Sequence, residues 1–308
     1  MTRPNITSPL RARRSQRTVR KPRRVPPISV VPTLLTLANL LCGFAALHYA
    51  AKPIGITSIF EWNSLTVAGL LIFVGMFFDS IDGSVARLTK STSDMGAMLD
   101  CLADIVTFGV APAFMMLQLV NFYYYGTESP QGTIIGPETD DVFAKVIWGV
   151  AAVYLCCAAL RLARFRVETD SDDIESQRYF NGLPSPGAAG AVASLIVLHQ
   201  HLLFRSPDAS NTAVFEKAFA LGIPIVTILC ALAMVSKIRY AHFVNRYLAP
   251  KQDFTYIAKI IVPIVFASLW PQITLAVGFT AYALSGPLLK LSGYRKSRLD
   301  RNLLDSDK

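Results

Sequence analysis

Charged side chains are scarce in this chain of 308 residues. Asp, Glu, Lys and Arg make up 17% of it, whereas hydrophobic residues make up 52%. A soluble domain carries about a quarter charged residues, so this composition argues against a soluble enzyme. The mean hydropathy of +0.40 points the same way. The composition therefore predicts an integral membrane protein.

The usual cysteine patterns of metal sites and disulfide frameworks are also missing. The five cysteines stand in apolar surroundings, and they form neither a CxxC pair nor a group with nearby histidines. They indicate neither a zinc site nor a disulfide-stapled fold. The acidic run over residues 168–175 lacks the glycine and the ligand spacing of a calcium loop, so we interpret it as a solvated loop.

Acidic residues are absent from the first 26 positions, which hold nine arginines and lysines. We interpret residues 1–26 as a basic cytoplasmic tail at the membrane surface, because positive charge is retained on the cytoplasmic side. A nucleic-acid-binding arm and an organelle transit peptide are the alternatives. We expect no nucleic-acid partner.

Long apolar segments fill most of the remaining chain and predict an all-α membrane protein of about eight helices, since a bilayer core takes about 20 residues per helix. Lys and Arg gather in the loops that would share a side with the basic tail, so we expect both termini in the cytoplasm. We expect a membrane domain over 27–245, a two-helix extension over 246–292 and a basic cytoplasmic tail over 293–308. The expected spans are 30–50, 65–86, 95–120, 144–165, 185–204, 214–235, 255–270 and 272–290.

Four carboxylates interrupt two of these apolar segments. Asp79 and Asp82 are three residues apart, and Asp100 and Asp104 are four apart, so each pair lies on one helical face. A short connection makes the two spans an antiparallel hairpin, which brings the pairs together. Clustered carboxylates repel in a low-dielectric site unless cations neutralise them. The pattern predicts a site for Mg²⁺ or Mn²⁺, which suits phosphoryl transfer.

Small and basic residues accompany the carboxylates. Gly83 lets a ligand approach the backbone, and Ala86 keeps the same helix narrow one turn on. Arg87 is a planar donor for a phosphate or a carboxylate, and Gly96 allows the two helices to approach closely. Ionisable groups at membrane depth mark a functional site.

Residues 79–104 read D-x-x-D-G-x-x-A-R-x8-G-x3-D-x3-D at every fixed position. This pattern resembles the signature of the CDP-alcohol phosphotransferases. The resemblance implies a helix bundle that transfers a substituted phosphate from a CDP-linked donor to an alcohol and releases CMP, with two Mg²⁺ or Mn²⁺ ions. It implies Asp79, Asp82 and Asp100 as metal ligands, and Asp104 as the general base and a further ligand. Donor binding is then expected at Asp79, Gly83, Ala86 and Arg87.

Residues 32–39 resemble the P-N-x-x-T-x-x-N entry to the first span of that family, with Thr33 where Asn is more usual. In the family this region borders the cytidine pocket, which implies Thr36 and Asn39 as donor-binding residues. Hydrogen bonding between helices is the alternative.

Two later stretches resemble the branch of the family that uses L-serine as its acceptor. Residues 159–189 match A-x-R-L-A-R-F-N…F-x-G-L-P-S-P-A-A-A, except that Arg166 replaces Asn and Gly187 replaces Ala, and residues 234–240 match M-V-S-x-x-x-Y. We expect Arg161 and Arg164 to bind the acceptor carboxylate or the donor phosphate. Anchoring at the membrane surface is the alternative.

The resemblance implies CDP-diacylglycerol, L-serine, membrane lipids and a second copy of the chain as partners. The asymmetry of Lys and Arg puts the site on the cytoplasmic face, and we expect a bacterial inner membrane. Choline, glycerol 3-phosphate and inositol are the alternative acceptors. A transporter of divalent cations or protons is the alternative from another class of protein.

Overall fold

A computed structural model describes residues 30–54, 62–88, 94–125, 136–138, 140–169, 179–204, 212–241, 266 and 269–306. Within these ranges the protein is almost entirely helical. The long helices are α1 (Val30–Ala50), α2 (Ser64–Leu88), α3 (Asp94–Asp104), α4 (Ala111–Tyr125), α5 (Val142–Thr169), α6 (Ser185–Phe204), α7 (Thr212–Val235) and α10 (Pro271–Ser306), with a π-helix η2 (Ile105–Val110) between α3 and α4.

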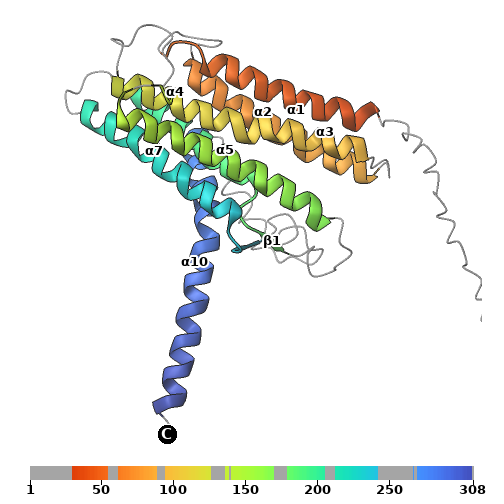
Figure 1. The fold of residues 1–308 in the computed structure, drawn as a ribbon, viewed down its shortest axis with the longest axis vertical. Coiled ribbons are helices and arrows are strands. Elements are labelled where there is room, and N and C mark those ends of the chain that lie inside the picture. The colour runs from red at the N-terminus through yellow and green to blue at the C-terminus, as the bar shows by residue number, and fades with distance from the viewer. Residues whose placement is uncertain are drawn as a thin grey trace, which may run out of the picture.

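The helices form one bundle (Figure 1). α1, α2 and the continuous α3–η2–α4 rod lie side by side, and α5 and α7 pack along that rod. α10 packs against α6, and its axis is steeply inclined to the other helices. α2 ends at Leu88 and α3 begins at Asp94, so the connection between them is short, as the sequence predicts.

Apolar outer faces agree with a membrane environment. On α1, Leu34, Leu41 and Phe44 are 60–67% exposed, an arrangement that lipid tails tolerate and water does not. Small residues fill the inner face instead, where Gly43, Ala46 and Ala50 are buried. Five described helices are long and apolar enough to cross a membrane. The prediction of an all-α membrane protein is therefore confirmed.

The number of eight spans is not confirmed. The five apolar helices cover Val30–Ala50, Ser64–Val85, Met95–Tyr125, Val142–Arg166 and Glu216–Val235. α6 coincides with the expected span over 185–204, and α10 contains the expected span over 272–290. The expected span over 255–270 lies largely outside the described residues.

Two short strands join the two stretches that resemble the serine-using branch. β1 (Tyr179–Asn181) pairs antiparallel with β2 (Arg239–Ala241), and Phe180 stands opposite Tyr240. Gly182 directly follows β1, and its N–H donates to the Ile238 carbonyl at 2.8 Å. Gly182 has a φ of +90°, and an added Cβ would lie 2.3 Å from the carbonyl oxygen of Met234. Only glycine fits this position.

We therefore predict that Gly182→Ala destabilises the protein by about 2 kcal/mol or more, because it combines a left-handed backbone with a backbone clash. The measurement is thermal unfolding of the detergent-solubilised protein. Gly149→Ala is the control, since a Cβ there meets nothing within 4 Å and alanine favours a helix interior. An equal loss of Tm in both variants would contradict the argument.

Candidate active site

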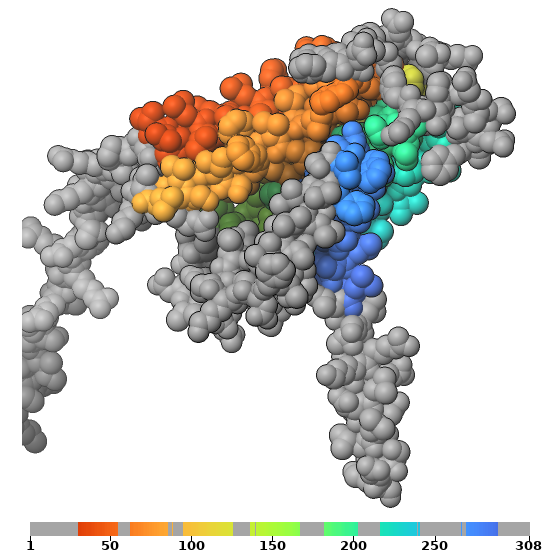
Figure 2. Space-filling model, turned by 180° about the vertical axis from the view of Figure 1, so that it is seen from behind, coloured from red at the N-terminus to blue at the C-terminus, as the bar shows by residue number. Residues whose placement is uncertain are grey.

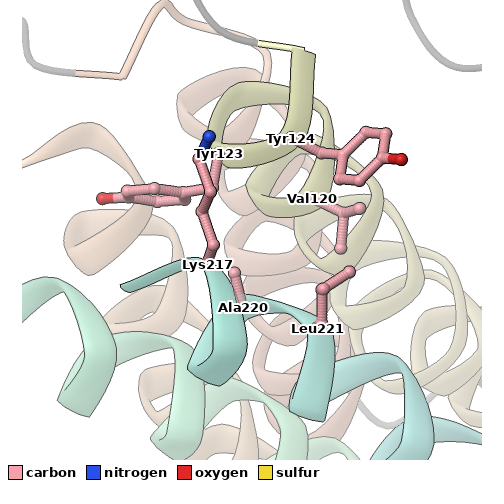
Figure 3. Close-up of a pocket in the computed structure, with 6 residues that line it drawn as sticks. All are labelled: Val120, Tyr123, Tyr124, Lys217, Ala220 and Leu221. Atoms are coloured by element: carbon pink, nitrogen blue, oxygen red, sulfur yellow. The ribbon is translucent and has the colours of Figure 1, made fainter. Parts of the chain in front are cut away.

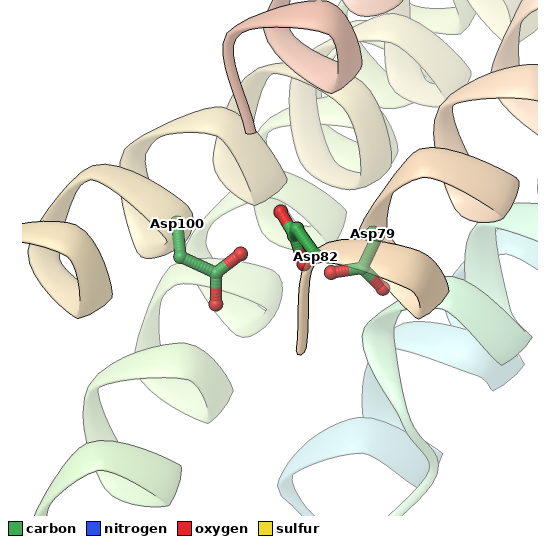
Figure 4. Close-up of side chains that lie close together, drawn as sticks. All are labelled: Asp79, Asp82 and Asp100. Carbon is green, nitrogen blue, oxygen red and sulfur yellow. The ribbon is translucent and has the colours of Figure 1, made fainter. Parts of the chain in front are cut away.

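Three carboxylates converge where the end of α2 meets α3 (Figure 4). One carboxylate oxygen from each of Asp79, Asp82 and Asp100 lies within 4.8 Å of the other two. Asp82 is 5% exposed, so the group lies inside the bundle end rather than on its surface. Asp104 lies at the end of α3, is 8% exposed and interacts with the carboxylate of Asp79. The structure thus brings the four predicted acids together.

α1 supplies hydrogen-bond donors to two of these acids. The Thr36 hydroxyl lies 2.8 Å from Asp82 Oδ2, and Asn39 Nδ2 donates to Asp104 Oδ1 at 3.1 Å. Both α1 side chains are buried. Hydrogen bonding between helices, the alternative for Thr36 and Asn39, is thus present in the structure, and its acceptors are the site carboxylates themselves. Donor binding by these two residues stays a prediction.

A π-helix follows Asp104 directly and gives the site a further support. Such segments are rare and are frequent at functional sites. Within η2 the Thr107 hydroxyl donates to the Asn39 carbonyl at 3.0 Å, so the backbone of α1 is tied to the turn after Asp104. Glycines permit this contact: a Cβ at Gly43 would lie 2.4 Å from Thr107 Oγ1, and one at Gly75 2.7 Å from Thr107 Cγ2. Sequence reasoning missed Thr107 because it stands outside the matched pattern.

The donor set fits a hard divalent cation. It consists of carboxylate oxygens, and the buried atoms Asp100 Oδ1 and Asn39 Oδ1 have no hydrogen-bond partner among the described residues. Buried oxygens of this kind call for a cation or a ligand. Gly83 is exposed, and a Cβ there would meet no atom of the described residues within 4 Å, which leaves room for a ligand beside Asp82 in this part of the chain. The side chains of Ala86 and Arg87 lie outside the described residues, and their roles stay predictions.

Arg161 is a buried basic residue that the structure places close to the carboxylates. It is 8% exposed, its Nη1 donates to Ser185 Oγ at 2.9 Å, and it lies within electrostatic range of Asp79. An arginine that only anchors at the surface would extend its charge into water, so this burial favours a role in the site. Sequence reasoning did not identify Ser185 as its partner, because the two residues stand 24 positions apart.

Two further arginines, Arg164 and Arg166, lie near the C-terminal end of α5. Arg166, which stands where the family pattern has Asn, lies within electrostatic range of Asp100. Arg164 is half-buried, and its predicted part in acceptor binding stays a prediction.

A second polar cluster lies at the opposite end of the bundle. Gln200 is buried, accepts from Asn63 Nδ2 at 2.6 Å and lies 3.3 Å from the Tyr123 hydroxyl. His199 contacts the Glu216 carbonyl at 3.1 Å and packs against aromatic rings. A small pocket between α4 and α7 lies nearby (Figure 3) and has no acid among its six lining residues. This cluster holds helices together and offers no set of metal ligands.

The hydrogen bond from Thr36 can be isolated by a matched pair of substitutions. Thr36 also lies 3.0 Å from the Pro32 carbonyl one turn back, and Thr227 on α7 makes only that kind of bond, to Ile223 at 2.9 Å. In EDTA we expect Thr36→Val to cost about 1.5–3 kcal/mol, because a buried carboxylate loses its donor. Thr227→Val should cost about 0.5 kcal/mol. Equal falls in Tm would show that the bond to Asp82 contributes nothing.

Comparison with known proteins agrees with this geometry. The family model described as CDP-alcohol phosphatidyltransferase matches residues 29–236, which include all four acids. A Helicobacter pylori (strain J99) protein named CDP-diacylglycerol–serine O-phosphatidyltransferase is 32% identical over 217 residues, or 70% of this chain and 74% of that protein. A Bacillus subtilis protein of the same name is 29% identical over 218 residues, 70% and 92% of the two chains. The chain belongs to the CDP-alcohol phosphatidyltransferase family.

Proposed function

We propose that this protein transfers the phosphatidyl group of CDP-diacylglycerol to the hydroxyl of L-serine, giving phosphatidylserine and CMP. The observation that carries the proposal is the convergence of Asp79, Asp82 and Asp100 at one end of an apolar bundle, in a chain of this family. The serine enzymes among its relatives support the choice of acceptor. The reaction belongs to phospholipid biosynthesis.

The placement of the site suits a lipid-linked donor. The acyl chains of the donor lie in the bilayer beside the apolar outer faces, and its CDP head reaches the carboxylates at the helix ends. The Lys and Arg bias places this end and both termini on the cytoplasmic side, in a bacterial inner membrane. On this proposal residues 27–245 form the catalytic membrane domain and 246–292 a C-terminal extension, between basic tails over 1–26 and 293–308. The protein acts as a homodimer, as the family resemblance implies.

The metal ligands in this proposal are Asp79, Asp82, Asp100 and Asp104, holding two Mg²⁺ or Mn²⁺ ions. When bound, such ions neutralise the carboxylates and stabilise the charge that develops on the phosphate oxygens. Thr36 keeps Asp82 oriented through its 2.8 Å hydrogen bond.

Asp104 is the general base. Its Oδ1 is held by the Asn39 amide at 3.1 Å, which leaves Oδ2 to take the proton of the serine hydroxyl. The serine oxygen then forms a bond to the phosphorus that carries diacylglycerol, and the bond from that phosphorus to the CMP oxygen breaks. CMP leaves with the electron pair, and Asp104 passes its proton to water.

The remaining predicted residues divide between the two substrates. Arg161 receives the serine carboxylate, since a guanidinium edge matches a carboxylate with two parallel hydrogen bonds, and Arg164 adds positive charge on the same helix. Gly83 and Ala86 allow the donor to approach the backbone of α2, and Arg87 binds the donor phosphate. Thr36 and Asn39 border its cytidine.

Release of CMP tests the reaction and the acceptor together. Purified protein in mixed micelles with CDP-diacylglycerol and Mn²⁺ should release CMP with L-serine but not with choline, glycerol 3-phosphate or inositol. Asp104→Asn should lower the rate at least about a hundredfold, the contribution of a positioned base, while Asp141→Asn, an exposed acid before α5, should not. No CMP with any alcohol would refute the enzyme, and CMP with choline alone would refute the acceptor.

Metal binding can be measured without turnover. Mn²⁺ at a hundred times its dissociation constant should stabilise the folded protein by about 2.7 kcal/mol, seen as a rise in Tm that EDTA reverses. Asp100→Asn should abolish most of that rise, because it removes one of the three converging carboxylates. Asp141→Asn is again the control. A rise of unchanged size in Asp100→Asn would show that the ion binds elsewhere.

A further inference from the structure

The first turns of α10 lie directly against the backbone of α6. A Cβ at Gly190 would lie 2.3 Å from Phe279 Cδ1, and a Cβ at Gly187 would lie 2.8 Å from Tyr282 Cε1. The two rings are three residues apart on α10 and occupy two glycine positions three apart on α6. Phe279 also packs against Phe73 of α2, with ring centroids 5.4 Å apart. Figure 2 shows this part of α10, in blue, between α2 in orange and the green to cyan helices.

Gly187 is one of the positions where the chain departs from the pattern of the serine-using branch, which has alanine there. The structure explains the departure, because the methyl group of an alanine would press on the Tyr282 ring. The glycine therefore belongs to a contact with a helix that lies beyond the residues matched by the family model, which end at 236.

The same contact reaches the basic side of the candidate site. Ser185, two residues before Gly187, accepts the hydrogen bond from Arg161 Nη1 at 2.9 Å. The Tyr282 ring, which occupies the space beside Gly187, therefore packs two residues along α6 from the hydroxyl that holds the Arg161 guanidinium. Arg161 is thus linked to α10 through Ser185 and the first turn of α6.

A second tyrosine, Tyr240, holds α10 next to the position of Tyr282. The Tyr240 hydroxyl donates to the Ala283 carbonyl at 3.1 Å, and a Cβ at Gly286 would lie 2.4 Å from the Tyr240 ring. Because Tyr240 belongs to β2, the strand pair and α10 are held together, and the ring of Tyr282 is packed from two sides.

We infer that Ser185 is a positioning residue that orients Arg161 toward the acceptor carboxylate, and that the Tyr282 ring of α10 holds Ser185 in place through its contact with Gly187. The inference rests on the proposed function, since it takes Arg161 as the group that receives serine. A guanidinium donates along fixed directions in its plane. The hydrogen bond from Nη1 to Ser185 fixes which edge of the guanidinium faces the substrate, so the arginine is already ordered before serine binds.

Steady-state kinetics of the full-length protein test this inference. Ser185→Ala removes the hydroxyl that accepts from Arg161 Nη1. We expect the KM for serine to rise about tenfold, the usual effect of losing one hydrogen bond to a charged group, while kcat and the KM for CDP-diacylglycerol change less than about twofold. Tyr282→Leu, which removes the ring that packs against Gly187, should raise the same KM.

Ser194→Ala is the matched control, because it removes a buried serine hydroxyl of the same helix that bonds the Ala191 carbonyl within that helix. It should leave the KM for serine unchanged. A serine KM in Ser185→Ala equal to that of the unmodified protein, or a rise of equal size in Ser194→Ala, would overturn the inference and leave the proposed function standing. Failure of the unmodified protein to release CMP with serine would instead remove the proposed function, and the inference with it.

Discussion

The mutual repulsion of four carboxylates at one end of an apolar bundle is the constraint on which the rest of the site depends. In a low-dielectric setting such charges persist only with donors or cations around them. The protein supplies part of this from α1, through Thr36 and Asn39, and part from α5, through Arg161 and Arg166. The buried Asp100 Oδ1 has no such partner among the described residues. The site is therefore incomplete by its own hydrogen bonding, which is what the proposed binding of cations requires.

Close helix packing follows from that constraint. Thr36 and Asn39 have short side chains, so α1 must approach α2 and α3 closely for them to reach the acids. Gly43 and Gly75 make room for Thr107, and the π-helix turns the Thr107 hydroxyl back to α1. Larger residues at these glycines would separate the donors from the carboxylates. The glycines that allow close packing thus also determine whether Thr36 and Asn39 reach the carboxylates with their hydrogen bonds.

Sequence reasoning predicted what depends on local spacing. The separations of three and four residues were enough to place Asp79 with Asp82, and Asp100 with Asp104, on common faces, and the short connection joined the two pairs. The partners from α1 could not be predicted in this way, because they stand 46 residues before Asp82 and 65 before Asp104. Such bonds depend on the relative height of distant helices, which packing decides. The π-helix, the strand pair and the continuous α10 were missed for the same reason.

The contact between α6 and α10 shows how a motif depends on sequence outside it. Within the motif alone, glycine at 187 in place of alanine weakens the resemblance to the serine-using enzymes. In the structure, the Tyr282 ring occupies the space that the methyl group of an alanine at 187 would need. The glycine at this position is therefore explained by the contact with α10. That contact lies two residues from the hydroxyl that holds Arg161, so on the inference above a change in the C-terminal helix alters the acceptor side of the proposed site. The residues of the family pattern then carry the chemistry, while α10, which lies outside that pattern, helps to position Arg161.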